Sequence, residues 1–190
     1  MRHGESQANQ QGLIVSAPSN GIDGYGLSAH GQNQVRQSVQ QALEQGFTPT
    51  RILSSDFKRA QETAQIAQQD FACAHDIVLY PQLRERFFGE LELGSHGNYQ
   101  RVWDKDVQDS AHTAFQVESA DSVLERTTGL VQQLEKDFSN EVFLLVAHGD
   151  TLQILQTAFQ QVPVTQHRAL QHLNTAEIRE LKLSSQQAHR

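Results

Sequence analysis

Apolar residues recur at helical spacing in four stretches of the chain, which predicts four amphipathic helices. The first begins at Ser28, a residue type that favours helix N-termini, and extends to about Gly46. The second starts near Asp56, the third covers residues 121–137, and the fourth follows Asp150. The inward stripes predicted for the first two helices are Val35, Val39, Ala42 and Leu43, and Phe57, Ala60, Ala64 and Ala67.

Short apolar runs between these helices predict strands over residues 51–54, 77–80 and 142–147, with a weaker one over 175–183. The run VFLLVA at 142–147 is continuously apolar, which is typical of a parallel strand covered on both faces. Because strands alternate with helices, we expect an α/β fold: a three-layer α/β/α sandwich with a mostly parallel sheet. The polar stretches 12–26 and 94–112 predict loops, and residues 1–190 are expected to form a single domain.

Charge and cysteine content narrow the classes of function. A formal net charge of −7 argues against a general nucleic-acid binder, yet a few converging cations would still hold a small anionic substrate. Cys73 is the only cysteine, so an intramolecular disulfide is excluded and a reducing compartment is favoured. No apolar run approaches the roughly 18 residues of a membrane span, and no signal-peptide pattern opens the chain. We therefore expect a cytoplasmic protein without a membrane partner.

Two His-Gly pairs stand where ligands bind in open α/β sheets. His148 and Gly149 follow the predicted strand 142–147, at its carboxyl end. His3 and Gly4 form the second pair, and a glycine after each histidine allows the backbone to approach an oxyanion closely. Arg59 falls in the first turn of a helix that follows a strand, close to the same rim.

These residue types suit phosphoryl transfer. A neutral imidazole is a competent nucleophile when its second nitrogen is held by a hydrogen bond. The guanidiniums of Arg2 and Arg59 would bind the equatorial phosphoryl oxygens in pairs. Glu85, in the segment LRERFFGELE, is the candidate for protonating the leaving alkoxide and later activating water, although Glu90 and Glu92 lie nearby.

Five ordered segments carry a family resemblance: Arg2-His3-Gly4 with Asn9 six residues after the histidine, then LSAHGQNQ, SSDFKRAQETA, LRERFFGELE and AHGD. Together they resemble the histidine phosphatase superfamily, in its phosphoglycerate-mutase-like branch, over residues 2 to about 160. The resemblance implies the α/β fold and a phosphohistidine intermediate, without a metal or another cofactor.

The same resemblance implies roles for individual residues. His3 would be the nucleophile, Glu85 the acid and base, and Asn9 a phosphate contact. The remaining members of the implied phosphate cradle are Arg2, Arg59 and His148, and the backbone at Gly149 would approach the substrate. The other histidines show no metal-ligand spacing, and Arg86 and Arg101 are expected to be solvated.

We therefore expect a metal-independent phosphatase acting on a small phosphomonoester. A phosphoglycerate-mutase-type isomerase is the first alternative, and a non-catalytic phosphate-binding protein is the second. The stretch between Glu85 and the helix at 121 is short and poor in cations, which favours hydrolysis over isomerisation. Family members carry an apolar strand ahead of the first motif, so we expect Met1 to be an internal residue of a longer natural chain.

Overall fold

A three-stranded parallel sheet lies at the centre of the computed structural model, which describes residues 1–183. Its strands are β1 (Arg51–Ser54), β2 (Val78–Leu79) and β3 (Phe143–Val146), in the order β2-β1-β3. Leu53 of β1 is paired with Val78 on one side and with Leu145 on the other. Because all three strands are parallel, their carboxyl ends meet at one edge of the sheet.

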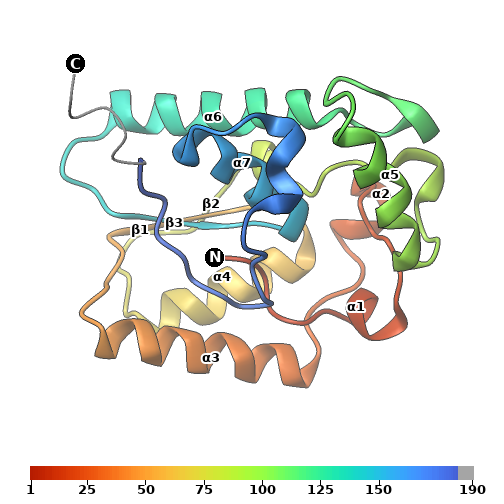
Figure 1. Cartoon of the computed structure of the whole chain (residues 1–190). Helices are drawn as coiled ribbons and strands as arrows, with labels where there is room; N and C mark the ends of the chain where they lie inside the picture. The colour runs from red at the N-terminus through yellow and green to blue at the C-terminus, as the bar shows by residue number, and fades with distance from the viewer. Residues whose placement is uncertain (184–190) are drawn as a thin grey trace, which may run out of the picture.

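Helices cover both faces of this sheet, α3 and α4 on one side and α6 and α7 on the other (Figure 1). The helices are α1 (Gln7–Gln11), α2 (Pro18–Gly21), α3 (Ala29–Glu44), α4 (Lys58–Asp70), α5 (Tyr99–Asp106), α6 (Ala120–Asp137) and α7 (Gly149–Gln160). Short 3₁₀ turns are η1 (Pro81–Leu83), η2 (Gly89–Leu91), η3 (His96–Asn98), η4 (Ala114–Gln116) and η5 (Val164–Ala169). The arrangement confirms the predicted α/β fold with a parallel sheet. No helix within residues 1–183 is long and apolar enough to cross a membrane.

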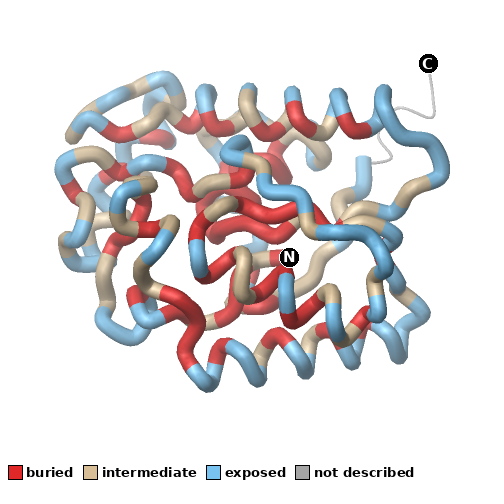
Figure 2. Tube along the Cα trace, turned by 180° about the vertical axis from the view of Figure 1, so that it is seen from behind, coloured by how far each residue is buried: buried red, intermediate tan, exposed pale blue. Residues whose placement is uncertain are grey.

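The four helices predicted from periodicity all form. The Ser28 hydroxyl accepts a hydrogen bond from the Gly31 amide and caps α3, as its residue type predicts. Figure 2 shows the buried residues gathered in the strands and on the inner helix faces. The stripe predicted for α4 is completely buried, whereas Leu43 of α3 is 42% exposed and was wrongly placed in the core.

The polar stretches are more ordered than predicted. Residues 12–26 include α2, which starts at Pro18, a residue whose fixed φ suits the first turn of a helix. Residues 94–112 include α5, whose Val102 is completely buried. Conversely, residues 175–183 form no strand: Ala176 and Glu177 instead make single backbone hydrogen bonds to His3 and Arg2, respectively.

The first residues of the chain lie beside the end of β3. The His3 amide donates to the Ala147 carbonyl at 3.0 Å, and the Ala147 amide donates to the Met1 carbonyl at 3.0 Å. The Met1 nitrogen is buried and donates to the Leu145 carbonyl at 2.7 Å. These bonds hold His3 at the carboxyl edge of the sheet.

Glycines allow α3 to pack directly against the loop that follows His3. A Cβ added to Gly31 would lie 2.0 Å from the Glu5 carbonyl oxygen, and one added to Gly4 would lie 2.5 Å from the Gly31 oxygen. Both close neighbours are backbone atoms, so neither can move as a flexible side chain would. The start of α3 therefore fixes the position of the loop at residues 4–5.

We expect Gly31→Ala to lower the free energy of unfolding by about 2 kcal/mol, because the backbone must shift to admit the methyl group. Gly129→Ala is the matched control: Gly129 is exposed in α6, and an added Cβ would meet nothing within 4 Å. This second change should stabilise the protein by about 0.5–1 kcal/mol through helix propensity. Urea unfolding of both variants measures the contrast, and equal effects would contradict the packing described.

Candidate active site

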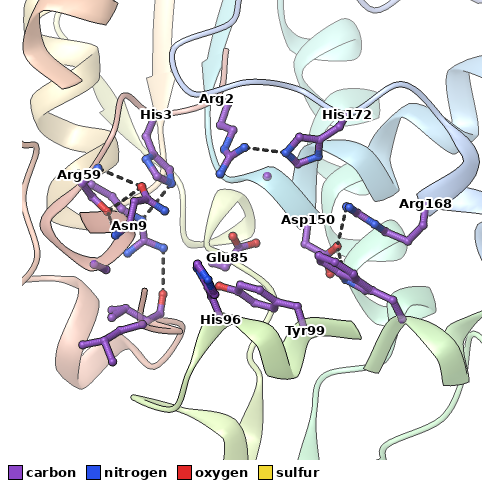
Figure 3. Close-up of a pocket in the computed structure, with 16 residues that line it drawn as sticks. Arg2, His3, Asn9, Arg59, Glu85, His96, Tyr99, Asp150, Arg168 and His172 are labelled. Carbon is purple, nitrogen blue, oxygen red and sulfur yellow. Dashed lines mark hydrogen bonds and ion pairs between the residues drawn. The ribbon is translucent and has the colours of Figure 1, made fainter. Parts of the chain in front are cut away.

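A cavity of about 230 Å³ opens at the carboxyl edge of the sheet. Three elements each bring a predicted site residue to it: the N-terminal segment (His3), the first turn of α4 (Arg59), and the junction of β3 with α7 (Gly149). Of the residues predicted for the site, those that line the cavity directly are Arg2, His3, Asn9, Arg59, Glu85 and Gly149. His148 lies beneath it, with its ring centroid 5.2 Å from that of His3. Figure 3 shows most of these side chains converging from separate elements.

The imidazole of His3 is held in a single tautomer. Its Nδ1 donates to the Gly4 carbonyl at 2.7 Å, while its Nε2 accepts a hydrogen bond from Nε of Arg59 at 3.1 Å. Burial, followed by the positive charges of Arg59 and Arg2, lowers the pKa of His3 well below its ordinary value. At neutral pH the ring is therefore uncharged, with the lone pair on Nε2.

Arg59 is anchored by two of its nitrogens. Besides the bond to His3, its Nη2 donates to the Val15 carbonyl at 2.9 Å. Nη1 is buried and has no partner among the described residues. The alternative pairing of Arg59 with Glu62 does not occur, because the Glu62 carboxylate accepts the Leu27 amide instead. Arg59 can thus offer one guanidinium nitrogen to an anion.

Arg2 approaches the same space from the opposite side of His3. Its Nη1 donates to the Leu173 carbonyl at 2.7 Å, and its Nε is buried without a partner among the described residues. Gly149 makes room for this side chain, since an added Cβ would lie 3.2 Å from the Arg2 Nε. Gly149 therefore makes room for Arg2, and the approach of its backbone to a substrate stays a prediction.

His148 is completely buried behind His3. Its Nε2 lies 2.9 Å from the Ser55 hydroxyl, which also accepts the Phe57 amide. The Ser55 hydroxyl can donate its proton to Nε2, and in that tautomer the ring proton lies on Nδ1, an atom without a partner among the described residues. Burial and the charge of Arg59 lower the pKa of His148 well below its ordinary value, so this neutral ring presents a donor.

Among the three neighbouring glutamates, Glu85 is the one that lines the cavity. Its Oε1 accepts the Arg86 amide at 3.0 Å and lies 3.1 Å from the Thr151 hydroxyl. Glu92 instead holds the Ser16 amide and hydroxyl, and Glu90 is exposed. Burial, followed by the negative charge of Asp150, raises the pKa of Glu85. The carboxyl group is thereby suited to carrying a proton.

Asn9 contributes both to local structure and to the cavity wall. Its Oδ1 accepts from the amide and hydroxyl of Ser6 at 3.0 Å each, which completes the capping box of α1. The amide nitrogen is left without a partner among the described residues. Asn9 can therefore act as a donor at the rim of the cavity (Figure 3).

Several wall residues were not found by sequence reasoning. Tyr99 and Trp103 of α5 stack with ring centroids 5.4 Å apart, and the Arg168 guanidinium lies 3.7 Å from the Trp103 ring centroid. His96 and His172 also line the cavity. The aromatic and apolar residues of 99–103 recur at helical spacing and could have signalled α5, but no local pattern places Arg168 or His172 at the site.

The prediction that Arg86 is solvated was wrong, whereas Arg101 is exposed as expected. Arg86 is completely buried, and its guanidinium donates to both carboxylate oxygens of Asp106 at 2.7 and 2.9 Å. It also lies 3.3 Å from Oδ2 of Asp150. The other oxygen of that carboxylate, Oδ1, accepts the Trp103 indole N–H at 3.0 Å. The buried cation is stable because two carboxylates balance it, a pairing between distant segments that sequence spacing does not show.

Within residues 1–183, no three histidine, cysteine or acidic side chains gather in an arrangement that could hold a metal ion. The polar atoms without a protein partner that surround His3 are Nε of Arg2, Nη1 of Arg59 and Nδ1 of His148, all of them donors. A small anion is the ligand that such a set of donors suits.

Comparison with known proteins identifies the family to which this chain belongs. Residues 1–189 match the sequence profile of the histidine phosphatase superfamily (branch 1). A probable phosphoglycerate mutase, GpmB of Escherichia fergusonii, is 32% identical over 181 residues, covering 92% of this chain and 79% of the relative.

Solved structures of phosphatases share the fold. A mycobacterial glucosyl-3-phosphoglycerate phosphatase in complex with VO3 matches with a TM-score of 0.76 and 24% identity, covering 92% of this chain and 87% of that one. The α-ribazole phosphatase from Shigella flexneri matches with a TM-score of 0.72 and 24% identity, covering 93% and 85%.

We expect Arg86→Met to lower the free energy of unfolding by about 3 kcal/mol, because the Asp106 and Asp150 carboxylates would remain buried without their cation. Arg101→Met is the matched control on the exposed face of α5 and should change stability by less than about 0.5 kcal/mol. Chemical unfolding of both variants tests the pair. A similar small effect for the two would show that the buried ion pair is not required for stability.

Proposed function

Because the chain belongs to branch 1 of the histidine phosphatase superfamily, we propose that it is a metal-independent phosphatase that hydrolyses a small phosphomonoester through a phosphohistidine on His3. The observation that carries the proposal is the buried, uncharged imidazole of His3, with its Nε2 beside the Arg59 guanidinium. A neutral histidine nucleophile next to fixed cations is the arrangement that phosphoryl transfer requires.

In the first half-reaction, His3 attacks the phosphorus atom. The Nε2 lone pair forms the P–N bond as the P–O bond to the leaving group breaks. Nδ1 keeps its proton, which stays hydrogen-bonded to the Gly4 carbonyl. Arg2 and Arg59 bind the equatorial oxygens, where charge is held in the transition state. Nδ1–H of His148 supplies a further donor from below. The protonated carboxyl of Glu85 gives its proton to the leaving alkoxide.

In the second half-reaction, the Glu85 carboxylate accepts a proton from an attacking water. The water oxygen bonds to phosphorus while the P–N bond breaks, which returns the lone pair to Nε2 of His3 and releases inorganic phosphate. Glu85 ends protonated, ready for the next substrate. One carboxyl group with a raised pKa thus acts as acid in the first half-reaction and as base in the second.

The substrate class follows from the size and wall of the cavity. A volume of about 230 Å³ admits a phosphoryl group with a small leaving group, and Tyr99, Trp103 and Arg168 would contact that leaving group. The phosphatases of similar fold are described as acting on glucosyl-3-phosphoglycerate and on α-ribazole phosphate esters, which favours a small organic phosphomonoester here too. The single cysteine suits a reducing compartment, so we place the activity in the cytoplasm.

A phosphoglycerate-mutase-type isomerase is the second candidate. The observation in its favour is the description of the 32% identical relative as a probable phosphoglycerate mutase. Both reactions share the phosphohistidine step and differ in its fate: a mutase returns the phosphoryl group to a bound intermediate, whereas a phosphatase passes it to water. Net release of phosphate from phosphoglycerate distinguishes them.

We expect the protein to release phosphate from p-nitrophenyl phosphate in the presence of EDTA, and His3→Ala to lower kcat at least about 1000-fold because no P–N bond can form. His75→Ala, at an exposed position remote from the cavity, is the matched control and should retain full activity. Labelling that is quenched in alkaline denaturant, in which the P–N bond of phosphohistidine survives, should find phosphate on the wild type only. Activity that needs a divalent metal, or that survives His3→Ala, would refute the proposal.

We expect kcat/KM to fall as the pH rises through the raised pKa of Glu85, because the phosphorylation step needs its protonated form. Glu85→Gln should remove this alkaline limb and lower kcat/KM about 100-fold or more for glycerol phosphate, whose alkoxide needs a proton. The loss should be much smaller for p-nitrophenyl phosphate, whose leaving group is weakly basic. Glu90→Gln, at an exposed position in the same segment, is the control. An equal loss for both substrates would argue against an acid role.

A further inference from the structure

We propose that His172 is a positioning residue that aims Arg2 at the phosphoryl group, and that protonation of His172 switches this positioning off. The inference rests on the proposed function of the cavity and assigns its pH control to a residue outside the family motifs. His172 lies beside Arg2 in the cavity wall (Figure 3).

The hydrogen bonds of Arg2 determine which edge of its guanidinium faces the cavity. Both protons of Nη1 are used: one is donated to the Leu173 carbonyl at 2.7 Å and the other to Nε2 of His172 at 2.9 Å. Nε is buried without a protein partner among the described residues. The edge formed by Nε and Nη2 is thereby directed to the anion, and this edge can bind two phosphate oxygens at once.

A buried amide sets the tautomer of His172. Oε1 of Gln153 lies 2.6 Å from Nη1 of Arg168, which has only protons to offer, so this atom is the amide oxygen. The same oxygen lies 3.1 Å from Nδ1 of His172, which must therefore carry the ring proton. Nε2 is left with its lone pair toward Arg2. Gln153 is completely buried and its nitrogen donates to the Leu170 carbonyl, so the amide is held on both sides.

The surrounding charges decide how readily His172 takes up a proton. Its ring faces the cations of Arg2 and Arg168 and the carboxylates of Asp150 and Glu177. The Arg179 guanidinium donates to the backbone carbonyl of His172. Burial lowers the pKa of His172, followed by the repulsion of Arg2 and Arg168, and the two carboxylates only partly offset this.

The sign of the pH effect follows from this geometry. Above the lowered pKa, His172 is neutral and accepts the Arg2 proton. Below it, Nε2 carries a proton and can no longer accept the hydrogen bond from Arg2. The two side chains are then both positively charged and repel each other. Because the pKa of His3 is lowered well below its ordinary value, the nucleophile stays neutral as His172 titrates. The acidic loss of activity is therefore a loss of Arg2 positioning.

The test compares His172→Gln, His172→Ala and the control His75→Gln in the full chain, with p-nitrophenyl phosphate as substrate and orthovanadate as inhibitor, from pH 5 to 8. A glutamine oxygen can accept the Arg2 proton but does not titrate. We expect His172→Gln to keep kcat/KM within about threefold at pH 7.5 and to lose the acidic limb that wild type shows. His172→Ala should raise KM and the vanadate inhibition constant about tenfold at pH 7.5, as for a lost hydrogen bond to a charged group, and this ratio to wild type should shrink at acidic pH, where wild type loses the same bond.

Gln153→Glu provides an independent second arm, because a carboxylate beside Nδ1 favours the protonated ring while still pairing with Arg168. We expect it to move the acidic limb to higher pH without changing kcat at pH 8. Each variant's kcat/KM, KM and vanadate inhibition constant are divided by the wild-type value at the same pH, which removes the effect of ionisation of the substrate and the inhibitor.

The outcomes separate the two proposals. If His3→Ala remains active, the proposed function fails. If His3→Ala is inactive but His172→Ala matches wild type in KM, vanadate inhibition and pH profile, only the positioning role fails. An unchanged acidic limb in both His172→Gln and Gln153→Glu would likewise overturn it, even where His172→Ala does not fold.

Discussion

The structure depends on keeping one imidazole uncharged inside a cluster of cations. His3 lies between the guanidiniums of Arg2 and Arg59, and burial removes the water that would otherwise screen them. A proton on this ring would face two fixed positive charges at close range, so the neutral form is favoured well below the ordinary pKa of histidine. The hydrogen bond from Nδ1 to the Gly4 carbonyl then leaves the lone pair on Nε2, the atom proposed to attack phosphorus. The proposed phosphate site and the proposed nucleophile thus depend on the same electrostatic constraint.

The parallel sheet supplies the geometry for this cluster. Its carboxyl edge brings together the junctions that follow β1 and β3, with the N-terminal segment lying beside β3. Close packing at glycines makes the approach tight enough: Gly31 admits the loop after His3, and Gly149 admits Arg2. Ser55, at the end of β1, orients His148 from behind. The positions of the site residues therefore depend on backbone contacts, which are stiffer than contacts between long side chains.

A second set of charges, formed by Asp150 and Arg86, raises a pKa in the same cavity instead of lowering one. The carboxylate of Asp150, balanced by buried Arg86, raises the pKa of Glu85, while the nearby arginines act to lower it. The pKa values of the proposed nucleophile and the proposed acid are thus shifted in opposite directions, as the proposed reaction at neutral pH requires. Asp150 also accepts a hydrogen bond from Trp103, so the same carboxylate connects the cavity wall to Glu85.

The sequence alone was sufficient for the fold class, the main helices and the chemistry-bearing pairs at His3 and His148. Apolar periodicity reports burial directly. The sequence failed for Arg86, His172 and Arg168, because their roles depend on partners 15 to 170 positions away, and pairing over that separation leaves no local pattern. It also misjudged residues 175–183, whose backbone hydrogen bonds go to Arg2 and His3 rather than into a regular ladder. Sequence determined which groups are present; the tertiary structure decided which of them are charged, because only burial and neighbouring charges set a pKa.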